Sequence, residues 1–188
     1  MKKIFAIFVS GYGRGAIEII NYSKKEVIKP KLGLVLSDNP SSFAIKVASE
    51  EEIPTAVIKK SCYKSVIDFE KKIISKLNIH NIDYIFLAGW MNIVNSTMIN
   101  KFTQKIVNIH PSLLPDFKGK NAIGQALDAG VKFTGITTHF VDETIDGGPI
   151  INQVPIQIHK DDNFDSLDKK IFNAGTELTI QTINSTFI

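Results

Sequence analysis

The chain has 188 residues, of which 44% are hydrophobic and 22% charged, a composition typical of one soluble globular domain spanning residues 1–188. The 22 basic and 19 acidic residues are scattered along the sequence, so the net charge of +3 predicts no nucleic-acid surface. A single cysteine excludes an intrachain disulfide, and no apolar stretch is long enough to span a membrane. These features fit a reducing compartment, so we expect a cytoplasmic protein with no nucleic-acid partner and no membrane partner.

Short apolar runs alternate with amphipathic helical patterns along the first part of the chain. Residues 4–9 form a continuous apolar run, which is typical of a strand buried on both faces of a parallel sheet. We expect further strands at 32–36, 55–58, 84–88 and 106–109, and helices at 16–23, 41–51, 66–77 and 96–102. This alternation predicts an α/β fold with a doubly wound, mostly parallel sheet that binds ligands beyond the carboxyl ends of its strands.

The pattern changes after Pro115. A helix is expected at 123–129, ending at Gly130, and is followed by strands at 135–141 and 150–157. These two strands predict a C-terminal hairpin, and an amphipathic pattern from residue 164 to about 182 predicts a closing helix.

A glycine-rich segment, Gly11-Tyr12-Gly13-Arg14-Gly15-Ala16, separates the first strand from the first helix. Backbone N–H groups and the positive end of a helix should face an anion there. The segment also fits the dinucleotide pattern G-x-G-x-x-A, with Asp38 where a ribose-binding acid would lie, so a dinucleotide-dependent oxidoreductase is one alternative. Arg14 is the only arginine, and its guanidinium can form two charge-assisted hydrogen bonds to a phosphate.

Asn108 and His110 lie two residues apart at the end of the fifth expected strand, so their side chains share one face. An amide donor beside an imidazole can stabilise a developing oxyanion, and the imidazole can also move protons. An isolated Asn-x-His pair is more often an ordinary strand end. The pair alone therefore does not predict a catalytic site, and that prediction needs support from other segments of the chain.

The segment Asp142 to Pro149 joins the two strands of the hairpin. Gly147-Gly148-Pro149 favours a tight turn that could fold the carboxylate of Asp146 towards His110, although an ordinary hairpin connection with solvated acids is the alternative. The other histidines show no metal-ligand spacing with one another, with His110 or with Cys62, so we predict no metal.

Four blocks together resemble the folate-dependent formyltransferase family, and within it the enzymes that formylate glycinamide ribonucleotide in purine synthesis. The blocks are Ser10-Gly11-x-Gly13, Leu87-Ala88-Gly89-Trp90-Met91, Asn108-Ile109-His110-Pro111-Ser112-Leu113-Leu114-Pro115, and His139-Phe140-Val141 with Asp146-Gly147-Gly148-Pro149. The last two are specific to folate-dependent formyl transfer. These two blocks are not expected in a dinucleotide-dependent oxidoreductase, so they favour the formyltransferase resemblance over that alternative.

The resemblance implies small-molecule substrates and a monomer or weak homodimer, and it implies a role for each block. Asn108 and His110 would hold the oxyanion formed when the acceptor amine attacks the formyl carbon of 10-formyltetrahydrofolate. Asp146 would keep the imidazole protonated or orient a water that carries the amine proton. The acceptor's phosphate and ribose would contact Gly11, Tyr12, Gly13, Arg14, Gly15 and Pro111. The folate would contact Lys64, Met91, Asn92, Ile93, Val94, Asn108, Phe140, Val141, Asp142 and Asp146.

Several positions depart from the family's pattern. Arg14-Gly15 stands where the family usually has Ser-Asn, and Asn92 where it has a basic residue. Lys64 is a possible substitute for an arginine near the folate's glutamate tail, while Phe172 and Gly175 fall where the closing helix usually offers polar groups. An amino sugar or an aminoacyl-tRNA is therefore an alternative acceptor, although such relatives usually carry a further domain. A non-catalytic folate-binding module is the third hypothesis.

Overall fold

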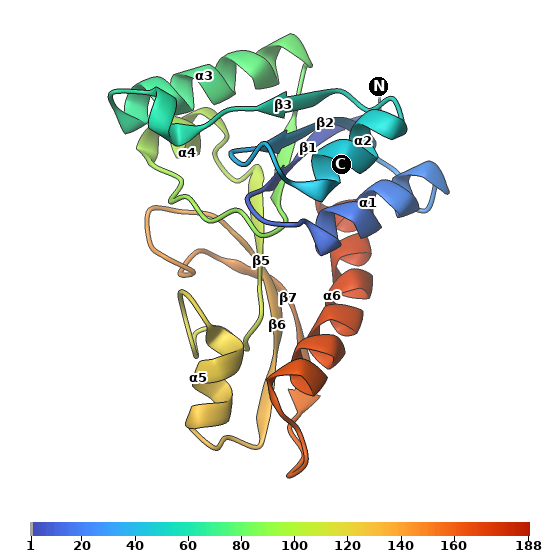
Figure 1. The fold of residues 1–188 in the computed structure, drawn as a ribbon, viewed down its shortest axis with the longest axis vertical. Helices are drawn as coiled ribbons and strands as arrows, with labels where there is room; N and C mark the ends of the chain where they lie inside the picture. Colours follow the sequence, from blue (N-terminus) through green and yellow to red (C-terminus); the bar gives the residue numbers. More distant parts are fainter. Residues whose placement is uncertain (1) are drawn as a thin grey trace.

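The computed structural model describes residues 2–188 as one mixed sheet flanked by helices (Figure 1). The strands are β1 (Ile4–Val9), β2 (Lys31–Ser37), β3 (Thr55–Val57), β4 (Tyr84–Leu87), β5 (Ile106–His110), β6 (Phe133–Phe140) and β7 (Ile150–Gln157). The helices are α1 (Arg14–Lys24), α2 (Phe43–Glu50), α3 (Val66–Ile79), α4 (Ser96–Lys101), α5 (Ala122–Asp128) and α6 (Phe164–Thr186). A short 3-10 turn, η1 (Lys60–Cys62), precedes α3.

The seven strands lie in the order β3-β2-β1-β4-β5-β6-β7. Neighbouring strands from β3 to β5 pair in parallel, whereas β6 runs antiparallel to β5 and β7 antiparallel to β6. The predicted α/β class, the mostly parallel sheet, the C-terminal hairpin and the closing helix are confirmed. The 3-10 turn was not predicted, because three residues without an apolar period give no helical pattern.

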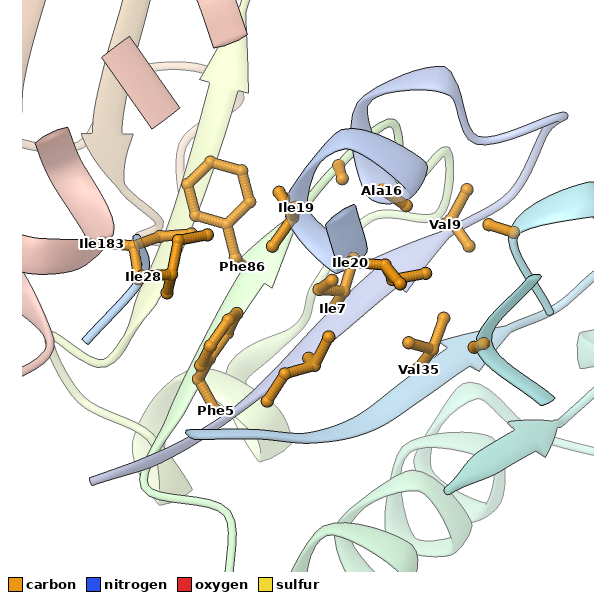
Figure 2. Packing of buried hydrophobic residues seen from close by; sticks show 14 of the residues in the cluster. Phe5, Ile7, Val9, Ala16, Ile19, Ile20, Ile28, Val35, Phe86 and Ile183 are labelled. Carbon is orange, nitrogen blue, oxygen red and sulfur yellow. The ribbon is translucent and has the colours of Figure 1, made fainter. Parts of the chain in front are cut away.

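Alternate side chains of β1 supply the cores on the two faces of the sheet. Phe5, Ile7 and Val9 belong to one apolar cluster with residues of α1, α2 and the end of α6, and Figure 2 shows this cluster extending from Val9 at one side to Ile183 of α6 at the other. Ala6 and Phe8 point to the opposite face, where α3 and α4 cover them. A strand buried on both faces explains why residues 4–9 are continuously apolar.

A third apolar cluster joins α5 and the β6–β7 hairpin to α6. It includes Ile123 of α5, Ile136 of β6, and Leu167, Ile171 and Leu178 of α6. A capping box starts α6, because the Asn163 side chain accepts from the Ser166 N–H and the Ser166 hydroxyl accepts from the Asn163 N–H. The same long helix thus contacts the hairpin at one end and β1 at the other (Figure 1).

The loops that follow β1 and β4 are tied together at the carboxyl edge of the sheet. The Ser10 N–H donates to the Gly89 carbonyl at 3.0 Å, and the Met91 N–H donates to the Ser10 hydroxyl at 2.9 Å. These bonds hold the glycine-rich loop beside the Met91 loop, next to the end of β5.

Candidate active site

Asn108 and His110 lie on β5, between the parallel strand β4 and the antiparallel strand β6. Asn108 is opposite Leu87 on β4 and His139 on β6, and His110 is opposite Thr137. His110 is only 5% exposed. Strand pairing therefore fixes Asn108 from both sides and His110 from the β6 side.

Asp146 lies beside both side chains. One carboxylate oxygen is 3.3 Å from His110 Nδ1 and accepts the Gly119 N–H at 2.8 Å, and the other accepts from Asn108 Nδ2 at 3.4 Å. Asp146 has a positive φ of 47°, a conformation that aspartate tolerates better than most residues. The loop between β6 and β7 thus folds Asp146 back towards β5.

The pKa of Asp146 lies below its ordinary value. Burial raises this pKa, but the close contact with His139, the hydrogen bond from the Gly119 N–H and the charges that His110 and His139 carry when protonated together lower it by more. The carboxyl group is consequently ionised at neutral pH. It can accept hydrogen bonds and stabilise a neighbouring cation, but it cannot serve as an acid.

The imidazole of His110 lies between two acceptors. Its Nε2 is 2.8 Å from the Phe117 carbonyl, and its Nδ1 faces the Asp146 carboxylate. Both nitrogens can donate at once only if both carry a proton. The surroundings therefore fit an imidazolium, a cation suited to stabilising negative charge.

His139 is a site residue that the sequence reasoning quoted only as part of a motif. Its Nδ1 is 2.9 Å from the Phe140 carbonyl, and its Nε2 is 3.2 Å from Asn108 Nδ2 and 3.6 Å from an oxygen of Asp146. With Nδ1 protonated against the carbonyl, a neutral ring accepts from Asn108 and a charged ring donates to Asp146. The register of the β5–β6 pair is the signal that would have identified it.

A cavity of about 610 Å³ opens beside these residues. Among the residues predicted to bind folate, eight line it: Met91, Asn92, Ile93, Val94, Asn108, Val141, Asp142 and Asp146. Phe140 packs against the core instead, and Lys64 is an exposed residue between η1 and α3 that does not line the cavity.

A second cavity of about 310 Å³ lies between α1 and α6. Five of the six residues expected to contact the acceptor line this cavity, namely Gly11, Gly13, Arg14, Gly15 and Pro111. Tyr12 does not, because its 62% exposed ring stacks on Phe43 with the centroids 5.0 Å apart. The two cavities share four lining residues beside the end of β5, namely Gly89, Ile109, Pro111 and Ile123.

The first turn of α1 faces the smaller cavity. Gly13 precedes the helix with a φ of 91° and gives its N–H groups no side-chain cap. A Cβ at this position would lie 2.6 Å from the Cβ of Ala44, so only glycine fits. Arg14 donates from Nη1 and Nη2 to the two oxygens of Asp168, at 2.8 and 2.9 Å, and these hydrogen bonds raise the pKa of Arg14.

Within residues 2–188, no group of three or more His, Cys, Asp or Glu side chains is arranged to hold a metal ion. A search of the same range finds no helix with the length and apolar character needed to cross a membrane.

Solved structures with this architecture include two enzymes of one kind. The crystal structure of glycinamide ribonucleotide transformylase 1 from Geobacillus kaustophilus superposes with a TM-score of 0.96 and 37% identity, covering 100% of both chains. That of phosphoribosylglycinamide formyltransferase from Bacillus halodurans has a TM-score of 0.94 and 37% identity, covering 97% of this chain and 94% of the other.

Sequence comparisons agree with the structural ones. Phosphoribosylglycinamide formyltransferase of Bacillus subtilis is 40% identical over 171 residues, which cover 91% of this chain and 87% of that protein. The human trifunctional purine biosynthetic protein adenosine-3 is 36% identical over 184 residues, and the chain spans only 18% of its length. The formyl transferase family model matches residues 2–183. The chain therefore belongs to the formyl transferase family.

Proposed function

We propose that the protein transfers a formyl group from 10-formyltetrahydrofolate to the amine of glycinamide ribonucleotide, a step of purine biosynthesis. The observation that carries the proposal is the ionised Asp146 held against His110 and Asn108 where two cavities adjoin. The similarity to relatives named for this acceptor supports it.

The smaller cavity suits the acceptor. Its glycine-rich wall presents the N–H groups of the first turn of α1, which favour a phosphate, and Arg14 adds a positive charge. The acceptor's amine would then extend towards Pro111 and Ile109, the side of the cavity that is shared with its larger neighbour.

The larger cavity suits the folate. Met91, Ile93 and Ile145 expose 62%, 63% and 61% of their surface and line the cavity, which offers apolar contact to a flat heteroaromatic ring. Polar groups for the ring's edge come from Asn92 and Asp142, which also line the cavity. The fit supports a folate donor.

The side chains at the end of β5 account for the chemistry. As the amine nitrogen bonds to the formyl carbon, the formyl oxygen becomes an oxyanion that Asn108 Nδ2 and protonated His110 stabilise. His110 Nε2 donates to the Phe117 carbonyl in the structure, so the oxyanion would replace that carbonyl as its acceptor. Asp146 stabilises the imidazolium, and a water beside it can carry the amine proton to the folate nitrogen that leaves.

A turnover assay tests the proposal. Purified protein with 10-formyltetrahydrofolate and glycinamide ribonucleotide should give formylglycinamide ribonucleotide and tetrahydrofolate in equal amounts. Parallel reactions with an amino sugar and with an aminoacyl-tRNA test the alternative acceptors. Product from one of those acceptors alone, or folate binding without product from any of them, would contradict the proposal.

A further inference from the structure

Arg14, Asp168 and Phe172 form one unit at the smaller cavity. The guanidinium donates to both oxygens of Asp168 at 2.8 and 2.9 Å, and its central carbon lies 4.6 Å from the centroid of the Phe172 ring. All three residues line the cavity. Arg14 belongs to α1 and the other two to α6, so the unit bridges the two helices.

The unit leaves hydrogen-bond donors free. A guanidinium has five N–H groups, and a two-pronged pair with a carboxylate uses two of them. The guanidinium carbon lies over the Phe172 ring, and an aromatic ring takes up none of the remaining N–H groups that lie in the guanidinium plane. Because the Arg14 side chain is 55% exposed, an anion can reach these donors while Asp168 stays bound.

The N–H groups beside Arg14 point to an anionic ligand. A cation in a first turn is unfavourable unless an anion lies nearby, and Asp168 already supplies that anion, so the indication comes from the N–H groups of the turn itself. The first turn of α1 contains no acidic residue, and its N–H groups have no side-chain cap. A phosphate in the smaller cavity would bind these N–H groups and Arg14 together.

We propose that Asp168 is a positioning residue that, with Phe172, fixes the Arg14 guanidinium for the acceptor's phosphate and thereby makes the enzyme selective for phosphorylated acceptors. This rests on the proposed function, because it concerns the acceptor end of the same reaction. An unpaired arginine loses side-chain freedom when it binds a ligand, whereas one already held by a carboxylate and a ring loses less. Asp168 therefore acts through Arg14.

Binding of ribose 5-phosphate and of ribose, measured by NMR titration, tests the proposal without formyl transfer. Arg14→Ala should weaken ribose 5-phosphate binding about tenfold or more, the loss expected for a charge-assisted hydrogen bond. Asp168→Asn should weaken it by about threefold to tenfold, and Asp168→Glu by less, because it keeps the carboxylate. The Arg14→Ala/Asp168→Asn double variant should bind like Arg14→Ala, and ribose binding should change in none of them.

The ion pair between Lys24 and Glu51 provides a matched control. It also joins α1 to another part of the chain, its side chains are similarly exposed at 63% and 35%, and neither residue lines a cavity. Lys24→Ala and Glu51→Gln should leave ribose 5-phosphate binding unchanged.

Four results would overturn the proposal. They are no ribose 5-phosphate binding by the unchanged protein, unchanged or tighter binding by Asp168→Asn, equal losses for ribose, and additive losses in the double variant. In turnover with glycinamide ribonucleotide, Asp168→Asn should raise KM and leave kcat within about twofold. A protein that binds ribose 5-phosphate as expected but does not formylate glycinamide ribonucleotide would contradict the proposed function alone.

Discussion

Asn108 and His110 share the Asp146 carboxylate, so they should act in catalysis as one unit. Asn108→Ala should lower kcat about a hundredfold or more, the usual loss for an oxyanion donor, and His110→Ala at least as much. The double variant should lose little beyond the worse single one, because either change alone dismantles the same stabilisation. Single-turnover rates of the three variants check this. Fully additive losses, or near-normal turnover by His110→Ala, would contradict it.

The lowered pKa of Asp146 makes stability depend on pH in a predictable direction. Its folded-state pKa lies below the ordinary carboxyl value of about 3.9, so the unfolded chain binds the proton first as the pH falls. The stabilisation is complete above that ordinary value and is lost as the pH falls through the folded-state pKa. Urea unfolding at successive pH values below about 6 should therefore show a steeper loss of stability for the unchanged protein than for Asp146→Asn. Parallel curves would contradict this.

At the scale of residues, the sequence predicts the site residues that belong to a recognisable motif. It does not predict those that come into contact only when distant segments pack together. Asn108, His110 and Asp146 belong to recognisable blocks. Asp168 lies 154 positions from Arg14, and no local pattern predicts that a carboxylate on α6 pairs with a turn on α1. His139 meets Asn108 through the register of two antiparallel strands, which apolar periodicity does not determine.

At the scale of elements, Glu70 links α3 to the wall of the larger cavity. This side chain is 2% exposed and accepts the N–H groups of Asn95 at 2.7 Å and Met98 at 3.3 Å, at the start of α4. Asn95 directly follows the loop of Met91 to Val94, which lines the cavity. A buried acid on α3 thus positions that loop.

Glu70→Ala should lower the free energy of unfolding by about 1–3 kcal/mol, because it removes the acceptor of the Asn95 N–H, while the Met98 N–H keeps its bond to the Asn95 carbonyl at 3.0 Å. The KM for the folate donor should rise while the KM for the acceptor stays unchanged. Glu70→Gln keeps one acceptor oxygen and should lose less. Chemical denaturation and the two KM values check this, and a stability loss with both KM values unchanged would show that Glu70 does not position the loop.

Element types followed from apolar periodicity, and element ends were less predictable. The closing helix was expected to end near residue 182 but continues to Thr186, since Ile183 and Phe187 remain buried against β1. Counting residues without gaps puts Val66 at the position near the folate's glutamate tail, and Lys64 is the nearby basic substitute. The unpredicted turn at Lys60–Cys62 shows why counting fails in this segment, whose path no pattern defines.

At the scale of the whole molecule, the loops that line the cavities and the aromatic contacts of Phe187 lie at opposite ends of the parallel strands. The loops that line the two cavities follow β1, β4 and β5, at their carboxyl ends. At the amino ends, Phe187 packs between Phe5 near the start of β1, with centroids 5.7 Å apart, and Tyr84 at the start of β4, at 4.6 Å. The parallel strands β1 to β5 separate these two regions, because all five have their carboxyl ends on one side.

Phe187→Ala should therefore lower stability without changing the reaction. Phe187 is 1% exposed, and removing a buried phenylalanine costs about 3–5 kcal/mol of unfolding free energy. Well below the unfolding temperature, kcat and both KM values should stay within about twofold, because the substitution leaves the ends of β4 and β5 in place. The neighbouring Ile188 is 78% exposed and is the matched control, since Ile188→Ala should change stability by no more than about 0.5 kcal/mol. Urea unfolding and steady-state kinetics on both variants check this. If Phe187→Ala changed kcat or either KM by much more than twofold, the two ends of the sheet would be coupled, contrary to this expectation.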